Sequence, residues 1–284
     1  MTTADASPVI LIGAARSGTK FLRDVLAVSQ DLAAVPYDVN YIWRYGAGDA
    51  PSDRLDPAAL TPKRIGFIRA AIARIAKPEA GQRVIEKTVS NTLRVPFVDA
   101  VYPDARYVHL IRDGRDVTES AMRMWQAKPD WRALLVKLRQ MPLSNIGYAV
   151  WFAGNILRGL FSGRKGGNVW GPRFDGIDQI ATTRGLAAVC AWQWRNSVTQ
   201  AGEDLAQIPR PRVYEIRYED LVNDEAALRG LVDWLGLCDP DAIVATWRAR
   251  VSTSQGSLWE GLPQADIDTI NKILAQPLAQ HGYK

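Results

Sequence analysis

Short apolar runs, each bounded by turn-forming or charged residues, recur along the chain between stretches that have helical spacing. Four of these runs predict buried β-strands at Val9–Ile12, Arg83–Glu86, Arg106–Ile111 and Val213–Arg217. Strands that alternate with helices form a parallel sheet through right-handed crossovers. The pattern therefore predicts an α/β protein in three layers, with helices on both faces of a central parallel sheet of about four to five strands.

The first predicted strand runs directly into a turn that is bounded by Gly13 and Gly18, and apolar residues at helical spacing follow. Glycines let the backbone turn tightly and approach a ligand. The amides of such a turn and the N-terminus of the following helix bind anions. The turn also carries Arg16, Ser17, Thr19 and Lys20. We expect a phosphate or a similar group to bind here, as in the P-loop NTPase-like α/β/α folds.

This turn departs from the Walker A motif of ATP- and GTP-binding proteins. That motif requires Gly-Lys-Ser/Thr after its four-residue gap. Here Gly18 is followed by Thr19 and only then by Lys20, and the first cation is Arg16. The departure weakens an assignment as a P-loop kinase, which stays open as an alternative.

A second strand end repeats this logic with other residues. Arg112 and Asp113 follow a predicted strand, Gly114 allows a turn, and a helix is expected to begin near Asp116. Ser120 then lies in the early turns of that helix, where its hydroxyl and Arg112 could bind one anion. Two alternatives remain: Arg112 could pair with Asp113 or Asp116 for structural reasons, or Asp113 could hold Mg²⁺. Together, two anion sites at adjacent strand ends suit a nucleotide with phosphate at both its 5′ and 3′ ends, whereas ATP needs one.

The length of the chain bears on its domain organisation, and its two cysteines bear on its redox environment. The 284 residues predict a single domain over 1–284, in which about 125–190 departs from the alternation of strands and helices. Cys190 and Cys238 both lie in apolar stretches, which indicates reduced thiols in the core. The first residues lack a basic region followed by an apolar core, so we expect a cytoplasmic protein.

Positive charge is concentrated in one region. The net charge is +5, but residues 123–173 contain nine basic side chains and one acid, so the rest of the chain sums to −3. This regional charge favours an acidic partner or a membrane surface over nucleic acid, and a solvated basic face is the alternative. The apolar run Met141–Phe161 is interrupted by proline and glycine, so it predicts a pocket wall or an interfacial helix rather than a membrane span.

Four motifs in order resemble those of sulfotransferases that use 3′-phosphoadenosine 5′-phosphosulfate (PAPS). The motifs are GAARSGTKFL, VIEKT, RDGRDVTES and IRYEDLV. They are similar to the group that includes tyrosylprotein, heparan and bacterial carbohydrate sulfotransferases. The resemblance covers roughly three quarters of the chain. It implies that the variable remainder, at about 125–190, is an insertion of helices and loops on the acceptor side. It implies PAPS as sulfuryl donor and 3′,5′-adenosine diphosphate as product.

The resemblance also implies nucleotide contacts. The 5′-phosphosulfate would bind Arg16, Ser17, Gly18, Thr19 and Lys20, although Lys20 departs from the usual second threonine. The 3′-phosphate would bind Arg112 and Ser120, and Tyr218 would contact the nucleotide. A shortened form of the nucleotide-covering loop, without its lysines, would contribute Ser252, Ser254 and Gln255.

The catalytic base has two candidates. Glu86 matches the base of the heparan N-sulfotransferase pattern, and Lys87 matches a lysine implicated in the chemistry. Asp38 lies near the position of the base in the tyrosylprotein group. Glu86 could instead only pair with Lys87 or an arginine, and Asp38 could only cap a helix. His109 lies inside a strand pattern and is expected in the core.

The expected mechanism needs no metal. A carboxylate takes the proton of the acceptor hydroxyl or amine while Lys87, Arg16 and Lys20 stabilise the leaving diphosphate. A transferring sulfuryl group carries less charge than a phosphoryl group, which normally needs Mg²⁺.

The acceptor is expected to be a carbohydrate, a glycolipid or another small amphiphile. Six of the ten tryptophans crowd the variable region and suit sugar rings or lipid tails, although they fit a core equally: Trp125, Trp131, Trp151, Trp170, Trp192 and Trp194. The second alternative function is a non-catalytic protein that binds a nucleotide or a membrane surface.

Overall fold

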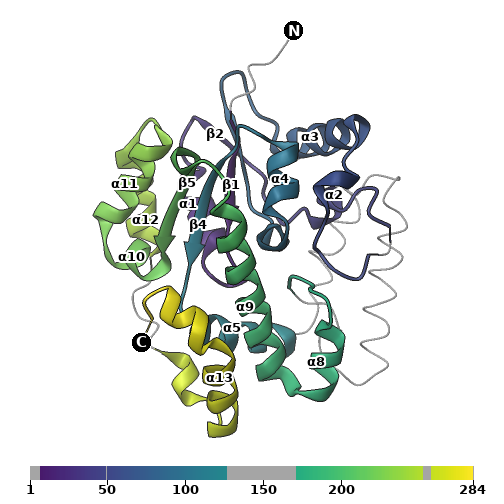
Figure 1. Ribbon diagram of the computed structural model, residues 1–284. Coiled ribbons are helices and arrows are strands. Elements are labelled where there is room, and N and C mark those ends of the chain that lie inside the picture. The colour runs from purple at the N-terminus through teal and green to yellow at the C-terminus, as the bar shows by residue number, and fades with distance from the viewer. Residues whose placement is uncertain (1–6, 49, 127–170, 252–256, 284) are drawn as a thin grey trace.

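The computed structural model describes residues 7–48, 50–126, 171–251 and 257–283. In this part of the chain, five parallel strands form one sheet in the order β2-β3-β1-β4-β5 (Figure 1). The strands are β1 (Val9–Ile12), β2 (Leu32–Ala34), β3 (Arg83–Glu86), β4 (Arg106–Ile111) and β5 (Val213–Arg217).

The sheet confirms the predicted fold class and all four predicted strands, with their bounds unchanged. The strand β2 was not predicted; it is three residues long and pairs with β3 at the edge of the sheet. Its sequence is Leu-Ala-Ala, which has no β-branched or aromatic residue and so gives little strand signal.

The central strand β1 shows how the sheet is covered on both faces. Val9 and Leu11 belong to one hydrophobic core and Ile10 and Ile12 to another, as the period of two of a strand requires. The first face is covered by α1 (Thr19–Leu26), α10 (Tyr218–Asn223), α11 (Glu225–Leu235) and α12 (Pro240–Arg250). The second face is covered by α2 (Asn40–Trp43), α3 (Pro62–Ala76) and α4 (Val95–Val101).

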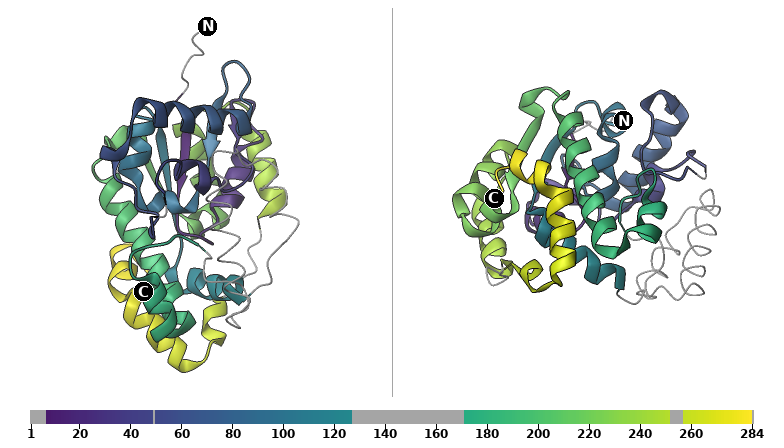
Figure 2. Two further views of the ribbon diagram at one scale, coloured as in Figure 1. Left: turned by 90° about the vertical axis from the view of Figure 1, so that its right-hand side faces the viewer. Right: turned by 60° about the horizontal axis from the view of Figure 1, so that its bottom comes forward.

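A third group of helices lies beyond the carboxyl ends of the strands (Figures 1 and 2). These helices share a core that includes Ala14 and Ile111 from the ends of β1 and β4. The group contains α5 (Gly114–Gln126), α8 (Ile177–Thr183), α9 (Gly185–Leu205) and α13 (Gln264–Gln280). Single turns of 3-10 helix connect the elements: η1 (Pro57–Ala59), η2 (Val89–Leu93), η4 (Arg210–Arg212) and η5 (Leu258–Gly261). The strand ends are therefore bounded by helices, which is where ligands bind in sheets of this kind.

One sequence expectation about local structure was wrong. Cys190 is a buried thiol as predicted, but Cys238 is exposed, because the apolar stretch ends at Leu237 and Cys238 lies in the turn before α12. The helix after β4 begins at Gly114, close to the predicted start near Asp116.

His109 is buried within β4, as predicted for a core residue. Its Nδ1 lies 3.1 Å from Oε2 of Glu215 on β5, so the histidine has a polar partner rather than a purely apolar environment. This hydrogen bond, more than any other interaction, lowers the pKa of Glu215.

The run 141–161 lies outside the described residues, as does most of 123–173. Among the helices that are described, none combines the length and the apolar character that crossing a membrane requires.

We predict that Gly114→Ala destabilises the fold by about 1–3 kcal/mol through overpacking. A Cβ at this position would lie 2.7 Å from ring atoms of Trp194 and 2.9 Å from Leu274. Gly202→Ala is the matched control, because Gly202 also lies in a helix and has nothing within 4 Å of an added Cβ. The control should be neutral or stabilising by up to about 1 kcal/mol. Thermal unfolding compares the two, and equal melting temperatures would contradict the predicted clash.

Candidate functional site

The turn between β1 and α1 is packed too closely for any residue but glycine at two positions. Gly18 has φ 92° and directly precedes α1. A Cβ at Gly18 would lie 2.5 Å from the ring of Tyr218, and one at Gly13 would lie 2.7 Å from the carbonyl oxygen of Leu110. The predicted turn and Tyr218 are therefore in direct contact.

Within this turn, Arg16 connects the first predicted anion site to the second. Its Nε donates a hydrogen bond to Oγ of Ser120 on α5 over 2.9 Å. Arg16 also has φ 76°, a left-handed conformation that non-glycine residues rarely adopt. Next to it, Ser17 is fully buried, and its Oγ has no hydrogen-bond partner in the described structure. An unpaired buried hydroxyl of this kind can bind an oxyanion without losing another contact.

Arg112, from the second predicted anion site, contacts the turn of the first. Its guanidinium lies 4.4 Å from the centre of the Tyr218 ring, and its Nη1 donates to the carbonyl oxygen of Arg16 over 3.4 Å. Nε1 of Trp194 donates to the carbonyl oxygen of Arg112 over 3.1 Å. The residues of the two predicted anion sites and Tyr218, which come from three separate motifs, therefore form one group.

Positive charges crowd this group. Burial lowers the pKa of Arg16, and the nearby charges of Arg123 and Arg112 lower it further, while Glu119 opposes this effect. Arg123 is paired with Glu119 at 2.8 Å and Arg112 with Asp116 at 3.8 Å. A bound anion would relieve the remaining repulsion, as expected of a site that binds phosphate-like groups.

Asp113 does not have the environment of a magnesium ligand. Its carboxylate accepts hydrogen bonds from Nε and Nη2 of Arg115, and the closest contact is 2.6 Å. Arg115 in turn lies 4.8 Å from the ring centre of Trp259. In the described ranges, no three His, Cys, Asp or Glu side chains are grouped so that they could hold a metal ion. The ion pair favours a structural role for Asp113.

Glu86 ends β3, the strand next to β1, and is fully buried. Its Oε1 accepts a hydrogen bond from the hydroxyl of Thr88, and its Oε2 accepts one from Nδ2 of Asn91 over 3.0 Å. Burial raises the pKa of Glu86 to about 7. The structure therefore gives this carboxylate a proton affinity that suits a base near neutral pH, but leaves no part of it exposed.

Asp38 and Lys87 lie beside Glu86. Nζ of Lys87 is 3.8 Å from Oδ2 of Asp38, so Lys87 pairs with Asp38 and not with Glu86. The backbone N–H of Val89 also donates to Asp38 over 3.0 Å. The Asp38 side chain is 26% exposed, which makes it the accessible carboxylate of the two. Both candidate bases and Lys87 thus share one region at the end of β3.

Two residues that stabilise the second predicted site, Glu219 and Tyr283, were not predicted from the sequence. The backbone N–H of Asp113 donates to Oε1 of Glu219 over 3.0 Å, and the hydroxyl of Tyr283 donates to Oε2 of Glu219 over 2.8 Å. The position of Glu219, directly after Tyr218, could have signalled this role. No local pattern marks Tyr283, because its contact joins residues 64 positions apart.

Other predicted residues are placed as follows. Lys20 is exposed on the first turn of α1. Thr19 is buried, and its side-chain methyl group approaches Gly13. Ser252, Ser254 and Gln255 lie outside the described residues.

The tryptophans in the described part of the variable region contribute to packing. Trp194 and Trp125 are buried in the core of the third helix group, and Trp192 packs against it. Trp131, Trp151 and Trp170 lie outside the described residues. A small apolar hollow beside Ala14 and Ala15 is lined by residues of α5 and α9, and it has room for about one water molecule. It is too small for a sugar ring or a lipid chain.

Comparison with known proteins gives one family. A family model described as the sulfotransferase family matches residues 8–153, which is more than half of the chain. No curated protein matches.

Solved structures resemble the fold. The sulfotransferase domain from the curacin biosynthetic pathway has a TM-score of 0.53 and 14% identity, and covers 98% of this chain and 98% of its own. Sulfotransferase STF9 from Mycobacterium avium has a TM-score of 0.54 and 13% identity, and covers 99% of this chain and 78% of its own. At these identities the likeness shows the fold alone.

We predict that Arg16→Gly abolishes stabilisation by sulfate without lowering the intrinsic stability of the fold. Glycine relieves the positive φ of this position, which offsets the loss of the hydrogen bond to Ser120, so the melting temperature in chloride should be about unchanged. Sulfate should raise the melting temperature of the wild type by binding the folded state, and the rise should disappear in the variant.

Lys77→Gly is the matched control for this measurement. Lys77 is an exposed cation with φ 51°, and it ends α3 away from the site. The control should keep the sulfate effect at equal ionic strength. If both variants lose it, sulfate acts on the protein generally and Arg16 holds no anion.

Proposed function

We propose a specific activity for this protein on one premise: the chain belongs to the sulfotransferase family. The proposed reaction transfers a sulfuryl group from PAPS to a hydroxyl or amine of an acceptor and releases 3′,5′-adenosine diphosphate. The observation that carries the proposed donor is the 2.9 Å hydrogen bond between Arg16 and Ser120, because it joins two anion-binding motifs in one site. A nucleotide with phosphate groups at both ends needs such a double site.

The chain offers a fitting group for each end of this donor. Arg16, the unpartnered hydroxyl of Ser17 and the closely packed Gly18 support binding of the 5′-phosphosulfate, together with Thr19 and Lys20. Arg112 and Ser120 are the proposed ligands of the 3′-phosphate. The ring of Tyr218, which contacts both Gly18 and Arg112, is the proposed contact for the nucleoside.

Glu86 is the proposed general base. Its strand-end position and its pKa of about 7 suit a group that must accept a proton near neutral pH. Because Glu86 is fully buried, the acceptor must displace some of the side chains that cover its carboxylate. Catalytic contacts often form only in the complex with substrate. Lys87 and Arg16 are proposed to stabilise the negative charge that develops on the leaving diphosphate. Asp38, which already pairs with Lys87, is the alternative base.

The proposed acceptor is a carbohydrate, a glycolipid or another small amphiphile. The support comes from the basic segment 123–173 and the apolar run 141–161, which suit an anionic or amphiphilic molecule. We also propose a cytoplasmic protein of one domain that contacts membrane surfaces through 123–173. The alternative of a P-loop kinase has less support, because the Asp113 carboxylate that would hold its magnesium is paired with Arg115.

We expect Glu86→Gln to lower sulfuryl transfer by about 10²-fold or more while the affinity for 3′,5′-adenosine diphosphate is kept. Transfer from ³⁵S-labelled PAPS to a lipid and polysaccharide extract measures the first effect, and calorimetry the second. Asp38→Asn is the matched comparison. A near-normal rate in Glu86→Gln with a large loss in Asp38→Asn would assign the base to Asp38.

The rate of transfer should rise with pH through a midpoint near 7. Burial raises the pKa of Glu86 to about 7, and a base works only in its deprotonated form, so activity is present above this pH and lost below it. The same raised pKa makes ionised Glu86 destabilising, so Glu86→Gln should melt no lower than the wild type at pH 8. A lower melting temperature of the variant at pH 8 would contradict the buried, high-pKa environment.

Transfer should continue in excess chelator. The proposed charge stabilisation comes from Arg16, Lys87 and Lys20, and the less charged sulfuryl group does not require Mg²⁺. Rates before and after treatment with EDTA test this. A loss of transfer that added divalent metal restores would overturn the metal-independent mechanism.

A further inference from the structure

Asn91 lies behind Glu86 and contacts it on the side away from the Thr88 hydroxyl. Nδ2 of Asn91 donates to Oε2 of Glu86 over 3.0 Å, while Oδ1 of Asn91 accepts a hydrogen bond from Nε of Arg94 over 2.9 Å. The two ends of a side-chain amide have opposite hydrogen-bonding roles. Because Arg94 can only donate, it requires the oxygen of the amide on its side. The amide nitrogen must therefore face Glu86.

Arg94 is itself held rigidly. Its side chain is fully buried at the start of α4, and its Nη2 donates to Oδ1 of Asn40 over 2.6 Å. The other terminal guanidinium nitrogen, Nη1, donates to the carbonyl oxygen of Asp53 over 3.4 Å. Burial lowers the pKa of Arg94 to about 10, so the group stays charged at neutral pH.

Asp53 provides the negative charge that a buried arginine needs. Its carboxylate accepts hydrogen bonds from Nδ2 of Asn40 at 3.0 Å, Nη1 of Arg44 at 3.1 Å, Oγ of Ser90 at 2.8 Å and the backbone N–H of Arg173 at 2.8 Å. Burial alone would raise the pKa of Asp53, but the charge of Arg94 and these hydrogen bonds lower it below its ordinary value.

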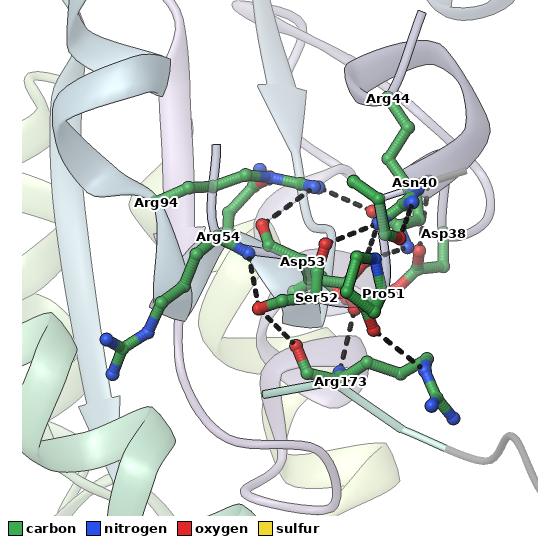
Figure 3. A network of polar contacts seen from close by, with 12 residues as sticks. Asp38, Asn40, Arg44, Pro51, Ser52, Asp53, Arg54, Arg94 and Arg173 are labelled. Carbon is green, nitrogen blue, oxygen red and sulfur yellow. Dashed lines mark hydrogen bonds and ion pairs between the residues drawn. The ribbon is translucent and has the colours of Figure 1, made fainter. Parts of the chain in front are cut away.

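Figure 3 shows how these groups converge on Asp53 from separate segments. Asn40 and Arg44 come from α2 and the turn after it, Arg94 from the start of α4, and Arg173 from the segment before α8. The charge of Arg94 is therefore compensated on the side away from Asn91. Its Nε remains directed at the amide.

We propose that Asn91 and Arg94 are positioning residues for Glu86: Arg94 orients the amide of Asn91, and that amide holds the Glu86 carboxylate in place and favours its ionised form. This inference rests on the proposed function, in which Glu86 is the base. A hydrogen bond donated to a carboxylate stabilises its charged form. The hydrogen bond from the Thr88 hydroxyl is the largest influence that opposes burial on the pKa of Glu86, and the amide of Asn91 acts in the same direction on the other carboxylate oxygen.

Other charges act on Glu86 from the neighbouring elements. Asp38, in the loop before α2, raises its pKa, and Lys87, the next residue after β3, lowers it. Arg94 and Glu86 also interact electrostatically across Asn91. None of these charged side chains is replaced in a variant of Asn91, but Asn91→Ala also removes the acceptor of Arg94 Nε. The comparison with the Glu86→Gln background therefore isolates the contribution of the amide to Glu86.

The first test measures stability and needs no acceptor. Asn91→Ala should raise the unfolding equilibrium constant about tenfold more at pH 8.5, where Glu86 is ionised, than at pH 5, where it is protonated. In the Glu86→Gln background this pH dependence should vanish. Thr92→Val is the matched control, since Thr92 is buried in the same turn and its hydroxyl donates to the carbonyl oxygen of Val89. Its cost should be equal at both pH values.

A purely structural network predicts a different result. The cost of Asn91→Ala would then be the same at pH 5 and pH 8.5, or its pH dependence would persist when Glu86 is replaced by Gln, and either outcome overturns the proposal. If Asn91→Ala does not fold, Asn91→Asp carries the same test, because it is isosteric and replaces the donor by a like charge. Its cost should also grow with pH and lose the part that depends on Glu86 in the Glu86→Gln background.

The second test separates this inference from the proposed function. Asn91→Ala should move the acidic limb of kcat/KM for transfer upward by about one pH unit and leave the affinity for 3′,5′-adenosine diphosphate unchanged. If Glu86→Gln is inactive but the profile of Asn91→Ala matches the wild type, the positioning role alone is wrong. If Glu86→Gln transfers normally, Glu86 is not the base and the positioning role falls with it, while sulfuryl transfer by the wild type stands.

Discussion

The rest of the site depends on the parallel pairing of β1 between β3 and β4. Ile10 is aligned with Glu86 on one side and with Tyr107 on the other, and all four residues of β1 are buried. Because the strands run in one direction, the segments that leave their carboxyl ends emerge at one edge of the sheet. Each of those segments carries one motif: the glycine turn, the Glu86 segment and the Arg112 segment. A shift of register in β1 would separate all three.

The contacts at this edge favour ligand binding over stability. Three arginines lie close together, Arg16 has a left-handed backbone, and the hydroxyl of Ser17 is buried without a partner among the described residues. Burial also raises the pKa of Glu86, so its ionised form costs free energy in the folded state. Each feature would be unfavourable in a purely structural turn, and such features concentrate at functional sites. The surrounding cores, which enclose β1 on both faces, supply the stability that permits them.

Local pattern predicted much of the fold because the buried strands are short apolar runs with clear boundaries. All four predicted strands were found with their expected bounds, and the alternation of strands and helices gave the correct fold class. The failures have local causes. The edge strand β2 was missed because its sequence, Leu-Ala-Ala, has no β-branched or aromatic residue. Cys238 was expected in the core but is exposed, because it lies just past the end of an apolar stretch. The roles of the proposed site residues remain predictions, although the structure brings the turn, Arg112, Ser120 and Tyr218 together.

The sequence by itself determined which residue types stand at the strand ends, since glycine turns, cations and the Glu86-Lys87 pair are all visible within short segments. Only the tertiary structure decided their partners. Lys87 pairs with Asp38 rather than with its neighbour Glu86, and the backbone N–H of Asp113 donates to Glu219, which also accepts a hydrogen bond from Tyr283. Asn91 donates to Glu86 and accepts from Arg94. The physical reason is that burial and pairing depend on segments far apart in the chain. A pattern of neighbouring residues records where an element begins and what it carries, but not which distant side chain will neutralise its charge.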